Sequence, residues 1–95
     1  MAYEITFTKA IRDQIRGLPG NVKAIAKQRI AELSDNPRLP RCKELAGHPN
    51  YYRLWLNKKY RLVWHVMDSE QLIELEYVGP KTPDLYAYLG LARPR

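Results

Sequence analysis

The chain has 95 residues, of which 45% are hydrophobic, and its 16 basic and 10 acidic residues give a formal net charge of +6. This apolar content argues against intrinsic disorder, and no apolar run approaches the roughly 20 residues that a membrane-spanning helix needs. The length favours a single domain over residues 1–95, because two smaller units would each bury too little apolar surface to fold.

Cysteine usage and the N-terminal sequence favour a cytoplasmic protein. Residues 1–10, MAYEITFTKA, lack the basic and apolar blocks of a signal peptide. Cys42 is the only cysteine, whereas small secreted domains usually carry several disulfides. The single cysteine and the two histidines show no recognised metal-ligand spacing, and the five glycines form no phosphate-binding loop. We therefore expect no metal site and no bound cofactor.

The first part of the chain predicts a strand followed by a short helix. Residues 3–7 alternate between apolar and polar side chains, which predicts a strand that directs Tyr3, Ile5 and Phe7 into the core. Thr8 is placed to cap the helix that follows. The apolar stripe of this helix consists of Ile11, Ile15 and Leu18, and Gly17 and Pro19 mark its end.

A second amphipathic helix is expected from Asn21 to Leu33, with Asn21 as its N-cap. The segment 37–50 contains three prolines and a glycine, and this punctuation predicts an irregular connection.

Residues 51–66 predict a hairpin with its turn at 57–59. Period-two alternation sends one set of side chains to the core and another to the opposite face. The core set is Tyr52, Leu54, Leu56, Leu62, Trp64 and Val66, and the opposite set is Arg53, Trp55, Arg61, Val63 and His65.

A last strand over residues 72–78 completes the predicted sheet. Its apolar side chains Ile73, Leu75 and Tyr77 alternate with Glu74 and Glu76, so we expect the apolar three to face the core. The fold class is α+β, with element order β-α-α-β-β-β. Two helices cover one face of a four-stranded, mainly antiparallel sheet, and the other face is partly open.

The positive charge is concentrated in the middle of the chain. Residues 38–61 hold seven basic side chains and one acidic side chain, whereas residues 62–79 hold four acidic side chains and no lysine or arginine. A concentrated positive field favours a polyanionic partner, although a merely solvated basic surface explains the composition equally well.

Several side chains on the open face have two interpretations. Trp55 is expected either to stack on a nucleic-acid base or to be covered by the C-terminal segment or a partner helix. A hydrogen-bonded surface role for His65 is favoured over a catalytic one. Glu74 and Glu76 are expected to form cross-strand ion pairs with Arg61 and His65 rather than to act as general bases.

Three sequence stretches resemble a known family. They are LAGHPNYYR at 45–53, KYRLVW at 59–64 and YVG at 77–79, which is followed by Tyr86 seven residues after the glycine. Together they resemble the RelE branch of the RelE/ParE toxins of bacterial and archaeal type II toxin–antitoxin pairs. The resemblance covers nearly the whole chain, and it implies the same β-α-α-β-β-β fold.

The resemblance also implies a function: ribosome-dependent cleavage of mRNA in the A site, by attack of the RNA's own 2′-hydroxyl on the neighbouring phosphate. Two departures from the family pattern accompany it. Trp55 stands where the family has a cation, and the loop between Gly79 and Tyr86 is one residue shorter. The implied catalytic residues are Arg53, Arg61, Lys81 and Tyr86, and charge and alternation add Trp55, Lys58, Lys59, Lys43 and His65 as RNA-binding residues.

The implied partners are a RelB-like antitoxin, the ribosome and mRNA, with no membrane and no small-molecule cofactor. The antitoxin is expected to wrap the helices, to block the basic face and to displace Leu85, Leu89 and Leu91. Two alternatives stay open: a ParE-like inhibitor of DNA gyrase without nuclease activity, and an RNA- or protein-binding module that only docks. New mRNA ends, loss of gyrase-dependent supercoiling, or salt-sensitive binding without cleavage separate the three.

Overall fold

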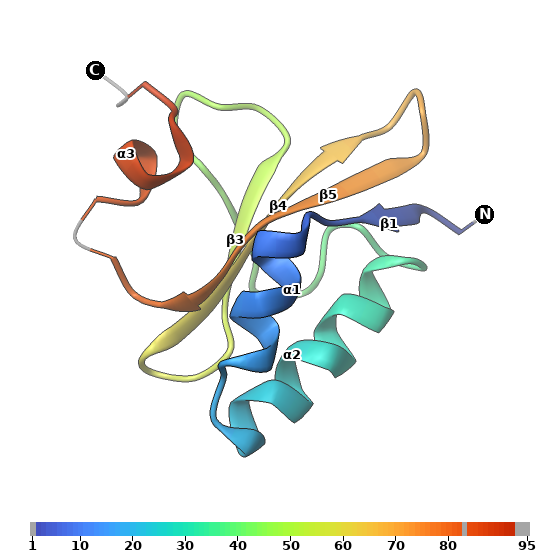
Figure 1. Ribbon diagram of the computed structural model, residues 1–95. Coiled ribbons are helices and arrows are strands. Elements are labelled where there is room, and N and C mark those ends of the chain that lie inside the picture. Colours follow the sequence, from blue (N-terminus) through green and yellow to red (C-terminus); the bar gives the residue numbers. More distant parts are fainter. Residues whose placement is uncertain (1, 83, 93–95) are drawn as a thin grey trace.

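The computed structural model describes residues 2–82 and 84–92, and within them the chain forms a five-stranded mixed sheet and three helices (Figure 1). The sheet order is β1-β5-β4-β3-β2, with β1 parallel to β5 and the remaining neighbours antiparallel. The strands are β1 (Glu4–Thr6), β2 (Lys43–Glu44), β3 (Tyr51–Trp55), β4 (Tyr60–Met67) and β5 (Leu72–Pro80). The helices are α1 (Lys9–Arg16), α2 (Gly20–Leu33) and α3 (Leu85–Leu89).

The α+β class and the order of the main elements confirm the prediction, and two short elements are additional. The two-residue strand β2 lies inside the connection that was expected to be irregular, and it pairs Lys43 with Arg53 and Glu44 with Tyr52. The helix α3 forms in the segment after the last strand. No helix in the described ranges is long and apolar enough to cross a membrane.

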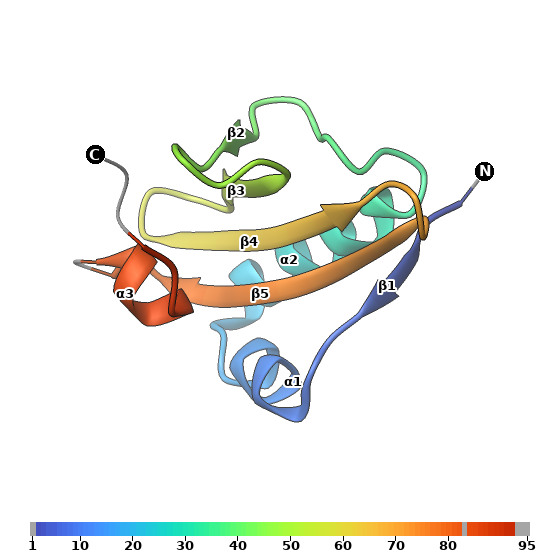
Figure 2. The same cartoon turned by 90° about the horizontal axis from the view of Figure 1, so that it is seen from above.

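The main core lies between the sheet and the helices α1 and α2. In Figure 2, α2 runs behind β4 and β5, and α3 lies at the end where β5 leads out of the sheet. Trp64 is fully buried at the centre of this core, and its indole Nε1 donates a hydrogen bond of 2.8 Å to the carbonyl oxygen of Pro37. All six hairpin side chains that alternation assigned to the core are buried there, which confirms that assignment.

Helix and strand ends follow the sequence only in part. Thr8 caps α1 as expected, because its hydroxyl accepts a hydrogen bond of 3.2 Å from the N–H of Ile11. The N-cap prediction for Asn21 is wrong, because α2 already begins at Gly20, directly after Pro19. The core prediction for Phe7 is also wrong: β1 ends at Thr6 and the Phe7 side chain is 45% exposed.

A register shift between β4 and β5 changes the orientation of the second half of β5. Val63 pairs with Tyr77 and Trp64 pairs with Leu75, so Glu76 is an extra residue, a β-bulge. The prediction that Tyr77 faces the main core is therefore wrong. Tyr77 packs on the opposite face of the sheet, in a second apolar cluster with Leu45, Val63 and Leu85.

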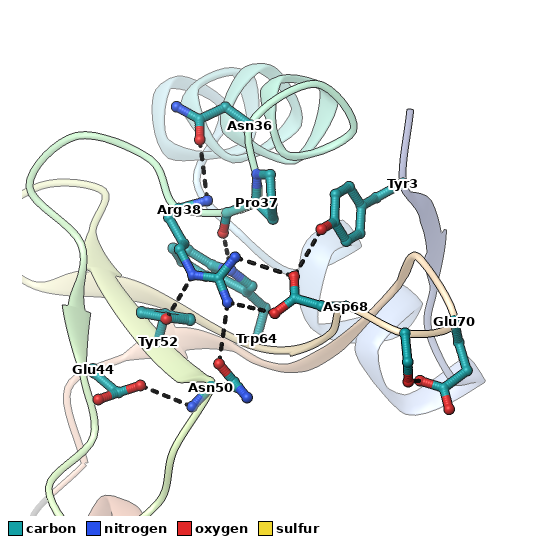
Figure 3. Close-up of polar contacts among 11 residues, drawn as sticks. Tyr3, Asn36, Pro37, Arg38, Glu44, Asn50, Tyr52, Trp64, Asp68 and Glu70 are labelled. Atoms are coloured by element: carbon teal, nitrogen blue, oxygen red, sulfur yellow. Dashed lines mark hydrogen bonds and ion pairs between the residues drawn. The ribbon is translucent and has the colours of Figure 1, made fainter. Parts of the chain in front are cut away.

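A polar network attaches the long connection after α2 to the far end of the sheet (Figure 3). The Arg38 guanidinium donates to both carboxylate oxygens of Asp68, at 3.2 and 2.8 Å, and to the hydroxyl of Tyr52 at 2.8 Å. Asp68 also accepts a hydrogen bond of 2.7 Å from the Tyr3 hydroxyl. These bonds, Arg38 first, lower the pKa of Asp68 to about 2. The network fixes the start of the connection that leads to β2 and Leu45.

Candidate nucleic-acid interface

The sheet face opposite α1 and α2 carries the predicted cations at the end nearest the β3–β4 turn. Trp55 on β3 pairs with Arg61 on β4, and Arg53 pairs with Val63 on one side and with Lys43 on the other. Arg53 is half-buried, and Trp55 and Lys43 are exposed. Strand pairing therefore brings three basic side chains and an indole ring from three neighbouring strands to one surface.

Arg61 is the most unusual of these residues because its charged side chain is only 4% exposed. Its Nη2 donates to the carbonyl oxygen and to the hydroxyl of Thr82 over 3.3 and 3.4 Å, which are long hydrogen bonds. Its Nε has no partner among the described residues. Burial, and secondarily the charge of Arg53, lower the pKa of Arg61. An anion that reached this buried guanidinium would satisfy its unused donor.

The Trp55 ring lies against the same guanidinium. The central carbon of Arg61 is 5.5 Å from the centroid of that ring, within the range of a cation–π contact. Trp55 is 46% exposed, so the described C-terminal segment leaves much of the ring open. The exposed ring is open to a stacking base or to a partner helix.

The lysines near this end come from two segments that the backbone joins. The N–H of Lys81, just after β5, donates a hydrogen bond of 2.8 Å to the carbonyl oxygen of Lys59 in the β3–β4 turn. The side chains of Lys58, Lys59 and Lys81 are all exposed. The three lysines add positive charge at the end of the sheet where β4 begins.

Tyr86 lies on α3, beside His48 and the second apolar cluster. Its ring is 5.6 Å from the His48 ring, and it packs against the second apolar cluster. Its hydroxyl makes no hydrogen bond within the described residues. The Asp84 side chain caps α3 by accepting a hydrogen bond of 3.1 Å from the N–H of Ala87. No described contact joins Tyr86 to Arg53, Arg61 or Lys81.

A row of rings continues from Tyr86 along this face, and sequence reasoning missed two of its members. His48 lies 6.1 Å from Tyr51, and Tyr51 stacks on His65 with 4.1 Å between ring centroids and 4° between planes. Tyr51 stands two residues before Arg53, so the same alternation could have placed it on this face. His48 had no such signal, since it belongs to a loop.

Known proteins of similar sequence and shape include RelE toxins. The mRNA interferase toxin RelE of Escherichia coli K12 is 29% identical over 82 residues, which cover 85% of each protein. A free-state mutant structure of E. coli toxin RelE superposes with a TM-score of 0.77 and 26% identity over 95% of this chain and 96% of that one. A chain of the intact E. coli RelBE toxin–antitoxin complex superposes with a TM-score of 0.73 and 29% identity. The match covers 85% of this chain and 99% of that one.

The chain is RelE-like in sequence and fold, similar to toxins of the RelE/ParE superfamily. No protein-family model matches it. An archaeal RelE–RelB complex from Pyrococcus horikoshii, 21% identical with a TM-score of 0.73 over 88% of this chain and 100% of that one, shares the fold.

The ion pairs expected for the RelE-like sheet face are not formed. Arg61 pairs in register with Gly79, and Glu74 pairs with His65 without a hydrogen bond or ion pair between the side chains. Within the described residues, neither Glu74 nor Glu76 has a basic partner. Burial, and then the charge of Glu74, raise the pKa of Glu76. The carboxylates thus form a separate acidic end of the face.

Proposed function

We propose that this RelE-like protein is the toxin of a type II toxin–antitoxin pair and cleaves mRNA in the ribosomal A site. The relatives named mRNA interferase RelE support this assignment. The structural observation that carries it is the buried Arg61, whose unpartnered Nε and exposed neighbour Trp55 suit a phosphate and an adjacent base.

In the proposed reaction, the 2′-hydroxyl of one nucleotide attacks the adjacent phosphorus. The attacking oxygen loses its proton, a 2′,3′-cyclic phosphate forms, and the bond to the 5′-oxygen of the next nucleotide breaks as that oxygen takes up a proton. Negative charge accumulates on the phosphate oxygens in the transition state. Fixed cations stabilise this charge without reorganisation, so Arg61 and Lys81 would hold the phosphate and Arg53 would orient it.

The reaction needs a base for the 2′-hydroxyl and an acid for the departing 5′-oxygen; Lys81 is proposed as the acid, with His65 as an alternative base to Tyr86. Tyr86 is proposed as the base or as a ring that stacks on the reacting nucleotide. Tyr86 lies on the five-residue helix α3. Loss of the hydroxyl alone distinguishes the two roles, since stacking needs only the ring.

The test is mRNA cleavage in a translating lysate, followed by primer extension, with Arg61→Ala and Tyr86→Phe. Removing Arg61 should slow cleavage on the order of 10²-fold or more, as loss of one anion-stabilising donor does elsewhere. Tyr86→Phe should slow it comparably if Tyr86 is the base, and little if it stacks. Arg29→Ala, at a partly exposed arginine on α2 paired with Glu32, is the matched control. Full activity in both site variants would refute the site assignment.

A RelB-like antitoxin is the proposed protein partner, because similar solved structures include RelE bound to RelB. The ribosome and mRNA would be the target, which places the protein in the cytoplasm. The alternatives predict different results in the same experiments. A gyrase inhibitor would reduce supercoiling without new mRNA ends, and a docking module would bind RNA in a salt-sensitive way without cleaving it.

A further inference from the structure

Three potential metal ligands converge at the acidic end of the sheet face. His65 on β4 pairs directly with Glu74 on β5, and the bulge at Glu76 brings a second carboxylate to the same side. One ligand atom from each side chain lies within 4.8 Å of the other two. In the sequence these residues are nine and eleven positions apart, a spacing that belongs to no short metal motif.

The three side chains have no hydrogen-bond or ion-pair partner among the described residues that would explain why they lie so close together. Within the described residues, none of them donates or accepts a hydrogen bond, and none forms an ion pair. Two carboxylates held this close repel each other unless a cation lies between them. The chain has a net charge of +6, yet none of its described lysines or arginines forms an ion pair with Glu74 or Glu76.

The ligands are held on a rigid support. His65 and Glu74 belong to a continuous antiparallel ladder, and Glu76 is half-buried. The Tyr51 ring stacks on the His65 imidazole at 4.1 Å and nearly parallel to it, which restricts rotation of the ligand ring. Support of this kind reduces the ordering that binding requires.

We propose that His65, Glu74 and Glu76 bind one divalent transition-metal ion of the Zn²⁺ type, with water completing the coordination. An imidazole nitrogen together with carboxylate oxygens suits zinc and related first-row metals, whereas Mg²⁺ and Ca²⁺ prefer oxygen ligands alone. Two atoms bonded to one zinc at about 2.0–2.2 Å are at most about 4 Å apart, so small side-chain rotations close the site. The ion would join β4 to β5 beside the bulge.

The experiment uses the full-length, tag-free protein, freed of metal with a chelator and dialysed. Titration calorimetry with ZnCl₂ should give one bound ion per chain, and saturating zinc should raise the Tm while equal MgCl₂ leaves it unchanged. Glu74→Gln and His65→Gln should each weaken zinc binding at least tenfold. Glu74 is exposed, so its variant is expected to fold, and far-UV circular dichroism checks that it does.

Matched controls separate this site from the other possible ligands. Glu70→Gln removes a nearby exposed carboxylate outside the cluster, while Cys42→Ser and His48→Gln remove the remaining thiol and imidazole. All three controls should keep the parent affinity. The proposal is overturned if zinc does not bind below millimolar concentration, if Glu74→Gln binds as well as the parent, or if a control variant abolishes binding.

Discussion

Replacing Arg61 with methionine should remove activity without loss of stability. A buried donor without a partner costs about 1–3 kcal/mol, and the Nε of Arg61 is such a donor. The hydrogen bonds to Thr82, at 3.3 and 3.4 Å, contribute less than the ~1 kcal/mol of a well-formed bond, and the contact with Trp55 contributes about 0.5–1 kcal/mol. Methionine keeps most of the buried apolar contact. These terms nearly cancel, so Arg61→Met should unfold with a free energy within ~1 kcal/mol of the parent or above it.

Urea unfolding followed by far-UV circular dichroism measures this difference. Leu62→Ala, at the next position of β4, is the matched comparison, because Leu62 is fully buried in the main core and its truncation should cost about 2–5 kcal/mol. The reasoning fails if Arg61→Met is destabilised by more than ~2 kcal/mol. Arg61 would then be a structural residue, and its loss of activity would say nothing about catalysis.

Three further predictions concern the backbone, acid stability and RNA affinity. A Cβ at Gly79 would lie 2.8 Å from the Tyr77 hydroxyl and 3.1 Å from its ring carbon Cζ. Gly79→Ala should therefore lower the free energy of unfolding in urea by about 1–3 kcal/mol, and by less in a Tyr77→Phe background. A Gly79→Ala variant as stable as the parent would contradict this. The pKa of Asp68, about 2 beside Arg38 against 3.8 ordinarily, means that its stabilising contribution is complete above pH 4 and lost as pH falls through 2. Thermal melts from pH 2 to 6 should show a shallower acid decline in Asp68→Asn than in the parent, and equal slopes would exclude Asp68 as the cause. Lys58→Ala should reduce the slope of log affinity for RNA against log salt by about 1, and an unchanged slope would place Lys58 outside the contact.

Alternation predicted the hairpin faces correctly because one face of these strands is deeply buried. A strand that placed Leu54, Leu62 and Trp64 on the solvent side would lose the main core, so the pattern has only one stable register. The same argument failed for Tyr77. A bulge at Glu76 depends on how β5 pairs with β4 and on the cover that Leu85 provides, and neither is encoded near Tyr77 in the sequence.

The sequence predicted which side chains share the open face, but not how deeply they are buried or what they pack against. Alternation and charge placed Arg53 and Arg61 on one face, and the structure agrees with this. Burial of Arg61 was not predictable, because its guanidinium contacts both the Trp55 ring and Thr82, which is 21 residues further along the chain. The packing of Tyr86 against the second cluster was also not predictable, because it is a contact between distant parts of the chain.

The sheet face has two ends of opposite charge, and this division limits how RNA can lie on it. Arg61 and His65 are four positions apart on β4, a distance of ~13 Å, which exceeds the screening length of ~8 Å at physiological salt. Between them lies the apolar cluster of Val63, Tyr77 and Leu85. An RNA whose phosphate is bound at Arg61 would not be stabilised by running along β4, because Glu74 would repel its next phosphate. The RNA should instead run across the sheet toward Lys58 and Lys81. A metal ion bound at His65 would neutralise the carboxylates, and the RNA could then also run along β4.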